Sequence, residues 1–226
     1  MIPRDNPIPA LLEFIGAWVS DLSPRHRIDA GSVPAFVPPP LRAIYEFAGN
    51  YPLPHTKQWR RPKWAVGLFG PQDQLPPPDQ LQVAGGRFRF IHENQGVWWC
   101  ETLADEHDPP VFSDCLAWQH GDQGMREMCS RLSHFLTTFC LQELAFGARH
   151  LFCVDSEVAG PSELVRQRPS RVWVNGVYAY KEPTHSFYLC DHGLLVMRAH
   201  GDFWLAYNAE RCASLISNAH DIRRIH

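Results

Sequence analysis

The sequence lacks the features that mark secreted and membrane-spanning proteins. No stretch approaches the roughly 20 uninterrupted apolar residues of a transmembrane helix, because charged residues, glycine or proline interrupt every run. The first residues show neither a basic segment followed by an apolar one nor a small-residue cleavage site, so we expect no signal peptide. The seven cysteines are odd in number and form no C-x-x-C pair, which is typical of reduced thiols. These absences predict a cytoplasmic protein.

Motifs of catalytic and metal-binding sites are also missing. Despite 12 histidines there is no H-E-x-x-H, no Cys/His cluster at ligand spacing, no G-x-S-x-G and no Walker A loop. We therefore expect no metal, no cofactor and no enzymatic activity. The enzyme hypothesis that stays open is a hydrolase built on His185, Asp191 and His192, which requires these side chains to converge in a pocket.

An excess of positive charge is absent too, since the net charge is −3. That balance disfavours nucleic acid and anionic membrane as partners. One segment, residues 57–64, interleaves four basic residues with two tryptophans and could bind a single strand. Packing of arginine on tryptophan within a surface loop explains the same composition. We predict neither a nucleic-acid nor a membrane partner.

What the sequence does contain is a globular balance of 45% hydrophobic and 20% charged residues over 226 positions. Helical periodicity falls in residues 10–19, 41–48 and 126–146, the last with a continuous apolar stripe. Strand patterns occupy residues 88–91 and 97–100, and Asn175-Gly176 predicts a hairpin between residues 171–174 and 177–180. Helices first and strands last predict an α+β fold with an antiparallel or mixed sheet, N-terminal helices and one long amphipathic helix.

An acidic block with two tryptophans stands out in the middle of the chain. From Glu93 to Asp114 there are six acidic residues and no lysine or arginine. Such a block can be the solvated face of a loop, or a patch that docks a basic partner protein through charge and aromatic anchors. In the second interpretation the docking residues are Trp98, Trp99, Glu101, Asp105, Glu106 and Asp108.

Two motifs within this region resemble a known family. The stretch from Phe88 reads F-x-F-x-x-E-N-Q-G-V-W and ends at Trp98, and D-P-P-V-F follows at residues 108–112. With them the chain resembles the SUKH superfamily, which includes fungal Smi/Knr-type regulators and bacterial immunity proteins. The resemblance covers residues 10–147. It implies a SUKH-like single domain over residues 1–226, and we expect the C-terminal meander, residues 165–220, to extend the same sheet.

The motif residues have structural interpretations of their own. Asn94, Gln95 and Gly96 suit a bend after Glu93, because Asn and Gly tolerate left-handed backbone. Asp108 can cap the turn that follows it, and Pro109-Pro110 holds the chain extended. The motif can therefore mark the fold rather than a binding site.

The resemblance implies a non-enzymatic protein that binds another protein. The leading hypothesis is a bacterial immunity protein that neutralises a cognate toxin, such as a nuclease, by stoichiometric occlusion. The alternative is a cytoplasmic regulatory adaptor that binds a housekeeping protein. The sequence identifies neither the partner nor the face that binds it.

Overall fold

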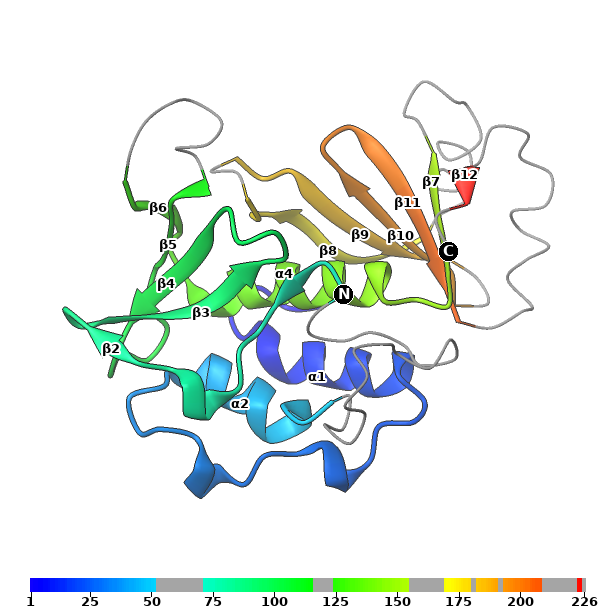
Figure 1. The fold of residues 1–226 in the computed structure, drawn as a ribbon. Helices are drawn as coiled ribbons and strands as arrows, with labels where there is room; N and C mark the ends of the chain where they lie inside the picture. The colour runs from blue at the N-terminus through cyan, green and yellow to red at the C-terminus, as the bar shows by residue number, and fades with distance from the viewer. Residues whose placement is uncertain are drawn as a thin grey trace.

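A computed structural model describes residues 1–51, 71–115, 124–154, 169–179, 182–190, 193–208 and 223–224. Residues 57–64, Asp191 and His192 lie outside these ranges. The N-terminal elements are α1 (Pro7–Trp18) and α2 (Pro39–Ala48), each opened by prolines in its first turn. Strands and one long helix, α4 (Leu132–Phe146), follow, so the predicted α+β class is confirmed (Figure 1).

The first sheet holds the strands that precede α4. Its order is β1-β3-β4-β5-β6, and β2 pairs with β3 beside β1. The bounds are β1 (Asp73–Gln74), β2 (Val83–Ala84), β3 (Arg87–Glu93), β4 (Trp99–Leu103), β5 (Val111–Ser113) and β6 (Arg126–Cys129). The predicted pairing of residues 88–91 with 97–100 is confirmed as the β3–β4 hairpin. Gly96 turns it with a φ of +72°.

The second sheet corrects the expectation for the C-terminal meander. Its order is β12-β7-β11-β10-β9-β8, and no strand of the first sheet takes part in it. The bounds are β7 (His150–Val154), β8 (Ser170–Gly176), β9 (His185–Leu189), β10 (Leu195–Ala199), β11 (Asp202–Tyr207) and β12 (Arg223–Arg224). The meander pairs with β7, the strand directly after α4, so it forms its own sheet and does not extend the first one.

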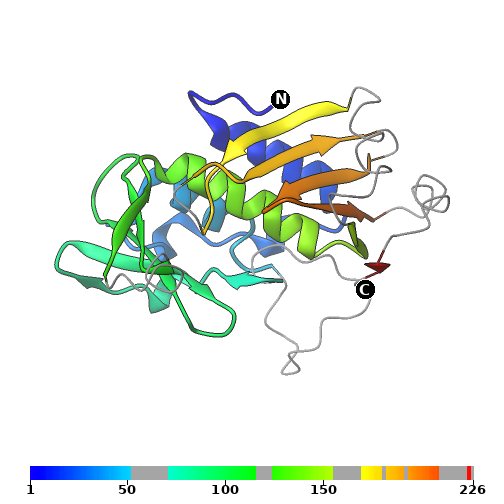
Figure 2. The same ribbon diagram turned by 90° about the horizontal axis from the view of Figure 1, so that it is seen from above.

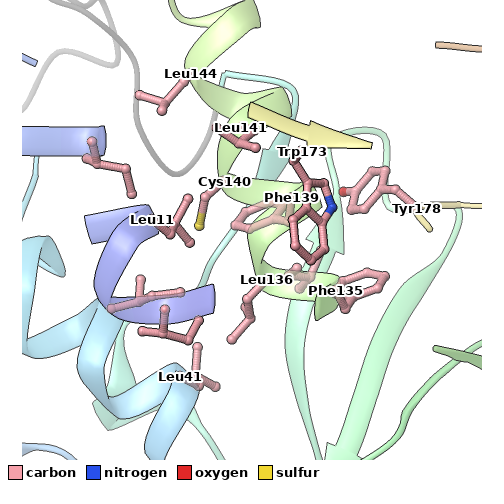
Figure 3. Packing of buried hydrophobic residues seen from close by; sticks show 14 of the residues in the cluster. Leu11, Leu41, Phe135, Leu136, Phe139, Cys140, Leu141, Leu144, Trp173 and Tyr178 are labelled. Carbon is pink, nitrogen blue, oxygen red and sulfur yellow. The ribbon is translucent and has the colours of Figure 1, made fainter. Parts of the chain in front are cut away.

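Helix α4 is the central element and is buried almost all round, with 13 of its 15 residues buried. The two views place the first sheet at one end of α4 and the second sheet along its length (Figures 1 and 2). In Figure 3, Leu11 of α1 and Leu41 of α2 lie on one side of the helix and Trp173 of β8 on another. The expectation of one apolar stripe therefore understates its burial.

Two local predictions are wrong for identifiable reasons. Residues 126–129 are strand β6 rather than the start of the helix, because they pair with β5. Asn175-Gly176 does not form a tight hairpin, since β8 runs through Gly176 and pairs with β9. A Cβ atom at Gly176 would lie 2.5 Å from Thr138 Oγ1 of α4. Glycine is needed there for close packing of the strand on the helix, not for a turn.

Candidate functional site

The side chains of the first sheet divide between a core face and an outer face. Phe88 pairs with Thr102, and both are buried. Arg89 pairs with Glu101, which in turn pairs with Phe112, so these three lie on the opposite face. We call this the outer face; alternation along the strands adds Arg87 and Trp99 to it, and the register shift between Arg89 and Ile91 adds His92, the partner of Trp99.

Three residues of the outer face form one connected cluster, Arg89–Trp99–Glu101. The guanidinium of Arg89 stacks over the Trp99 ring at 3.9 Å from its centroid. Glu101 Oε1 accepts a hydrogen bond from Arg89 Nε at 3.3 Å and another from Trp99 Nε1 at 2.9 Å. The side chain of Arg89 remains 51% exposed. The cluster therefore holds an arginine and a tryptophan in fixed positions at an accessible surface.

A groove of about 460 Å³ adjoins this cluster, and we call it the β2–β3 groove. On one side it is lined by Pro76, Gln80 and Gln82, from the segment that runs between β1 and β2, and by Ala84 of β2. On the other side it is lined by residues of β3 and β4, among them Arg87, Arg89, His92 and Glu101. Arg87 stacks over the Phe112 ring at 3.8 Å. Burial, followed by the charge of Arg89, lowers the pKa of His92, which keeps its imidazole neutral at pH 7.

The motif residues at the β3–β4 bend form hydrogen bonds with one another inside the bend. Glu93 Oε2 accepts the backbone N–H groups of Gln95 at 2.9 Å and Val97 at 3.1 Å. The N–H of Gly96 donates to the carbonyl of Glu93 at 2.9 Å. Asp73 of β1 is the strand partner of Glu93, the last residue of β3 before the bend. These contacts hold the bend closed and attach it to β1.

The second motif is tied to the start of α4. Asp108 Oδ1 accepts the N–H of Ser133 at 2.7 Å, and Oδ2 accepts Ser133 Oγ at 2.7 Å and Arg131 Nε at 2.8 Å. The carbonyl of Pro109 accepts the N–H of Leu132 at 2.7 Å. The carbonyl of Pro110 accepts Thr102 Oγ1 at 2.9 Å. Asp108 therefore caps the helix from 25 residues away in sequence.

The acidic block does not form one continuous patch. Four of its six carboxylates accept hydrogen bonds within the fold: Glu93, Glu101, Asp108 and Asp114. Asp105 and Glu106 are exposed, just beyond the end of β4. Trp98 packs edge-on against Tyr178, with the ring centroids 5.9 Å apart. Among the proposed docking residues, Trp99 and Glu101 lie on the outer face, whereas Trp98 and Asp108 contact other parts of the chain.

Sequence reasoning missed the two arginines and Phe112 of the outer face. The signal was present in Phe88-Arg89-Phe90, where an arginine alternates with two buried phenylalanines. That alternation places the arginine on the open face of a half-buried strand. The acidic block is defined by residues that follow one another along the chain. In the fold, the neighbouring strand β3 places the positive charges of Arg87 and Arg89 beside it.

A buried acidic group lies between β1, α4 and Tyr178, which follows β8. Tyr178 Oη donates to Asp73 Oδ2 at 2.5 Å. Glu143 accepts the backbone N–H groups of Gln72 at 2.9 Å and Asp73 at 3.2 Å. Burial is the main cause that raises the pKa of Asp73 to about 6 and the pKa of Glu143 well above its ordinary value. The group can retain protons near neutral pH, and it ties β1 to the rest of the core.

The residues of the hydrolase hypothesis are only partly described. His185 is 1% exposed, with Nδ1 2.9 Å from Thr184 Oγ1 and its ring edge-on to His200 at 5.0 Å. Burial lowers the pKa of His185 to about 3, with the charge of His200 acting in the same direction. Over the described ranges, no group of three or more His, Cys, Asp or Glu side chains is arranged to hold a metal ion.

Within the described part of the chain, no helix has the length and apolarity needed to cross a membrane. Comparison with protein-family models, curated proteins and solved structures gave no match for this chain.

Proposed function

We propose that this protein is a non-enzymatic binding module that neutralises a toxin protein by docking the outer face of its first sheet against it. The observation that carries the proposal is the Arg89–Trp99–Glu101 cluster, in which an accessible arginine and a tryptophan are fixed by stacking and hydrogen bonds. Arginine and tryptophan are the residue types that most often dominate binding energy at protein interfaces.

Pre-organisation supports the choice of this surface. Side chains that are already ordered lose less conformational entropy on binding than free surface side chains do. Arg87 stacked on Phe112 adds a second ordered arginine on the same face. The exposed Asp105 and Glu106 lie at its margin, where charged residues change association rates more than final affinity.

Toxin neutralisation is the specific form of binding that the SUKH resemblance suggests. Stoichiometric occlusion needs a stable, accessible surface, and the ordered Arg89–Trp99–Glu101 cluster on the outer face supports that role. A regulatory adaptor would use the same kind of surface for a housekeeping protein. The identity of the captured partner separates the two.

The test uses the full chain and the neighbouring open reading frame. That frame is expressed in a bacterial host with the wild-type protein, with Trp99→Ala or with Arg171→Ala, and growth is recorded. We expect the frame to arrest growth, the wild type and Arg171→Ala to restore it, and Trp99→Ala to fail. Arg171 is an exposed arginine of β8 in the second sheet, so it controls for general surface changes.

Complex formation is then measured on the purified proteins by size-exclusion chromatography. A complex near 1:1 with the wild type that is lost with Trp99→Ala supports docking through the outer face, provided the variant keeps the wild-type circular dichroism spectrum. Failure of the wild type to relieve growth arrest, with capture of housekeeping proteins instead, would favour the adaptor. Equal binding by Trp99→Ala would rule out the outer face.

A further inference from the structure

The β2–β3 groove lies where the edge of the first sheet is interrupted. β1 pairs with β3 at His92 and Glu93, and β2 pairs with β3 at Arg87 and Phe88. Between these two short pairings the chain leaves the sheet through the 3-10 helix η3 (Pro78–Gln80). The groove is bounded by this segment on one side and by β3 on the other.

The charges around the groove are not balanced. Arg87 and Arg89 line it, and the one carboxylate in its lining, Glu101, is already paired with Arg89. Arg87 makes no ion pair with any residue that the structure describes, and its guanidinium lies over the Phe112 ring, 3.8 Å from the ring centroid. His92, which also lines the groove, supplies no negative charge that could balance Arg87. One cation of the groove is therefore left without an internal counter-charge.

The guanidinium of Arg87 also indicates which kind of ligand group the groove can bind. The guanidinium of Arg87 lies over the Phe112 ring, and its planar fork of N–H donors matches the geometry of a carboxylate. Gln80 and Gln82 are exposed on the opposite side of the groove, and each side-chain amide there offers N–H donors beside a carbonyl acceptor. Donors on both sides favour a ligand group that accepts hydrogen bonds and carries negative charge.

We propose that the β2–β3 groove binds an aspartate or glutamate side chain on an extended segment of the partner protein, with Arg87 as its anchor. This inference rests on the proposed function and assigns the charge of the contacting segment. The acidic block, counted along the sequence, suggested a basic partner segment. The residues around the groove favour an acidic one.

The inference is tested with the full chain and three labelled peptides, followed by fluorescence anisotropy. The first peptide alternates glutamate with valine, and the other two replace glutamate with glutamine or with lysine. We expect the wild type to bind the glutamate peptide at least about tenfold more tightly than either of the others, since a charge-assisted hydrogen bond contributes more than about 1.4 kcal/mol. Arg87→Gln should weaken that binding by about tenfold, and Arg171→Gln should leave it unchanged.

Three results would overturn the inference. These are equal binding of the glutamate and glutamine peptides, equal binding by Arg87→Gln and the wild type, and binding of an oligothymidylate as tight as that of the glutamate peptide. The last would show a phosphate site instead. If the toxin complex depends on Trp99 while the peptides fail these tests, the proposed function stands and the acidic-segment inference falls.

Discussion

At the scale of single residues, the identity of a carboxylate does not reveal what it contacts. Glu93, Glu101 and Asp108 occur in one acidic block, yet they close a bend, hold the Arg89–Trp99 stack and cap α4. Each of these contacts depends on a chain direction or a strand register that forms only in the fold. The sequence could therefore indicate Trp99 and Glu101 as candidates, but it could not separate them from Asp108.

The clearest residue-scale prediction concerns Asp73. Its ordinary pKa is 3.8, and burial raises it to about 6 in the folded protein. A carboxyl whose pKa is raised by folding stabilises the protein fully below pH 3.8, and that stabilisation is lost as the pH rises through about 6. In Asp73→Asn this dependence is absent, so relative to the wild type the variant should gain about 2 to 3 kcal/mol of unfolding free energy between pH 4 and pH 7.5.

Urea unfolding of both proteins at the two pH values measures this difference. Comparing the variant with the wild type cancels the opposite contribution of His185, whose lowered pKa costs stability as the pH falls below 6.5. Asp105→Asn, at an exposed position, is the matched control for the change from a carboxylate to an amide. A parallel pH profile for Asp73→Asn and the wild type would mean that the Asp73 carboxyl titrates normally.

At the scale of elements, the sequence pattern predicted the helices and strands that local interactions determine. The β-type residues 88–91 and 97–100, with a glycine at position 96 between them, predicted the β3–β4 hairpin correctly. The start of α4 was misplaced because its cap, Asp108, comes from a distant segment and β6 pairs with β5. Gly176 was misassigned to a turn because the residue that requires glycine there is Thr138, on another element.

Gly176→Ala tests that close approach. The added methyl group would lie 2.5 Å from Thr138 Oγ1 and 2.9 Å from Thr138 Cγ2, so β8 must move away from α4. We expect a loss of about 1 to 3 kcal/mol of unfolding free energy, the usual cost of overpacking. Chemical denaturation measures it, and Gly31→Ala, where a Cβ meets no atom within 4 Å, should change stability by less than about 0.5 kcal/mol.

A double-mutant cycle ties the loss to this contact. Thr138→Ala removes both atoms that collide with the new methyl group, although it also leaves Trp173 Nε1 without its partner at 3.0 Å. In Gly176→Ala/Thr138→Ala the two losses should therefore be less than additive. If the two losses of unfolding free energy were strictly additive, glycine at position 176 would not be required to leave room for Thr138 of α4.

At the scale of the whole molecule, the order of strands in the two sheets could not be predicted from the sequence. The meander needed an apolar surface to pack on, and both α4 and the first sheet could have supplied one. Pairing with β7 decides the outcome, since β7 emerges from α4 and brings the meander onto the helix. Long-range pairing of this kind leaves no periodic signal along the chain. The α+β class was predictable because it depends on the elements alone.

The prediction that residues 1–226 form a single domain leads to one last expected outcome. One hydrophobic cluster includes Phe90 and Val111 of the first sheet, Phe139 of α4, and Leu195 and Met197 of the second sheet. If this shared core couples the sheets, Phe139→Ala should lower the opening free energy of amides in β4 and in β10 by the same amount, about 3 to 5 kcal/mol.

Native-state hydrogen exchange of the wild type and the variant reads both sheets in one sample. Phe146→Ala, at a partly buried position at the end of the same helix, is the control and should cost less in both sheets. A large loss in β10 with unchanged protection in β4 would mean that the sheets open independently. In that case the outer face would retain its structure, and its ability to dock a partner, even when the second sheet is open.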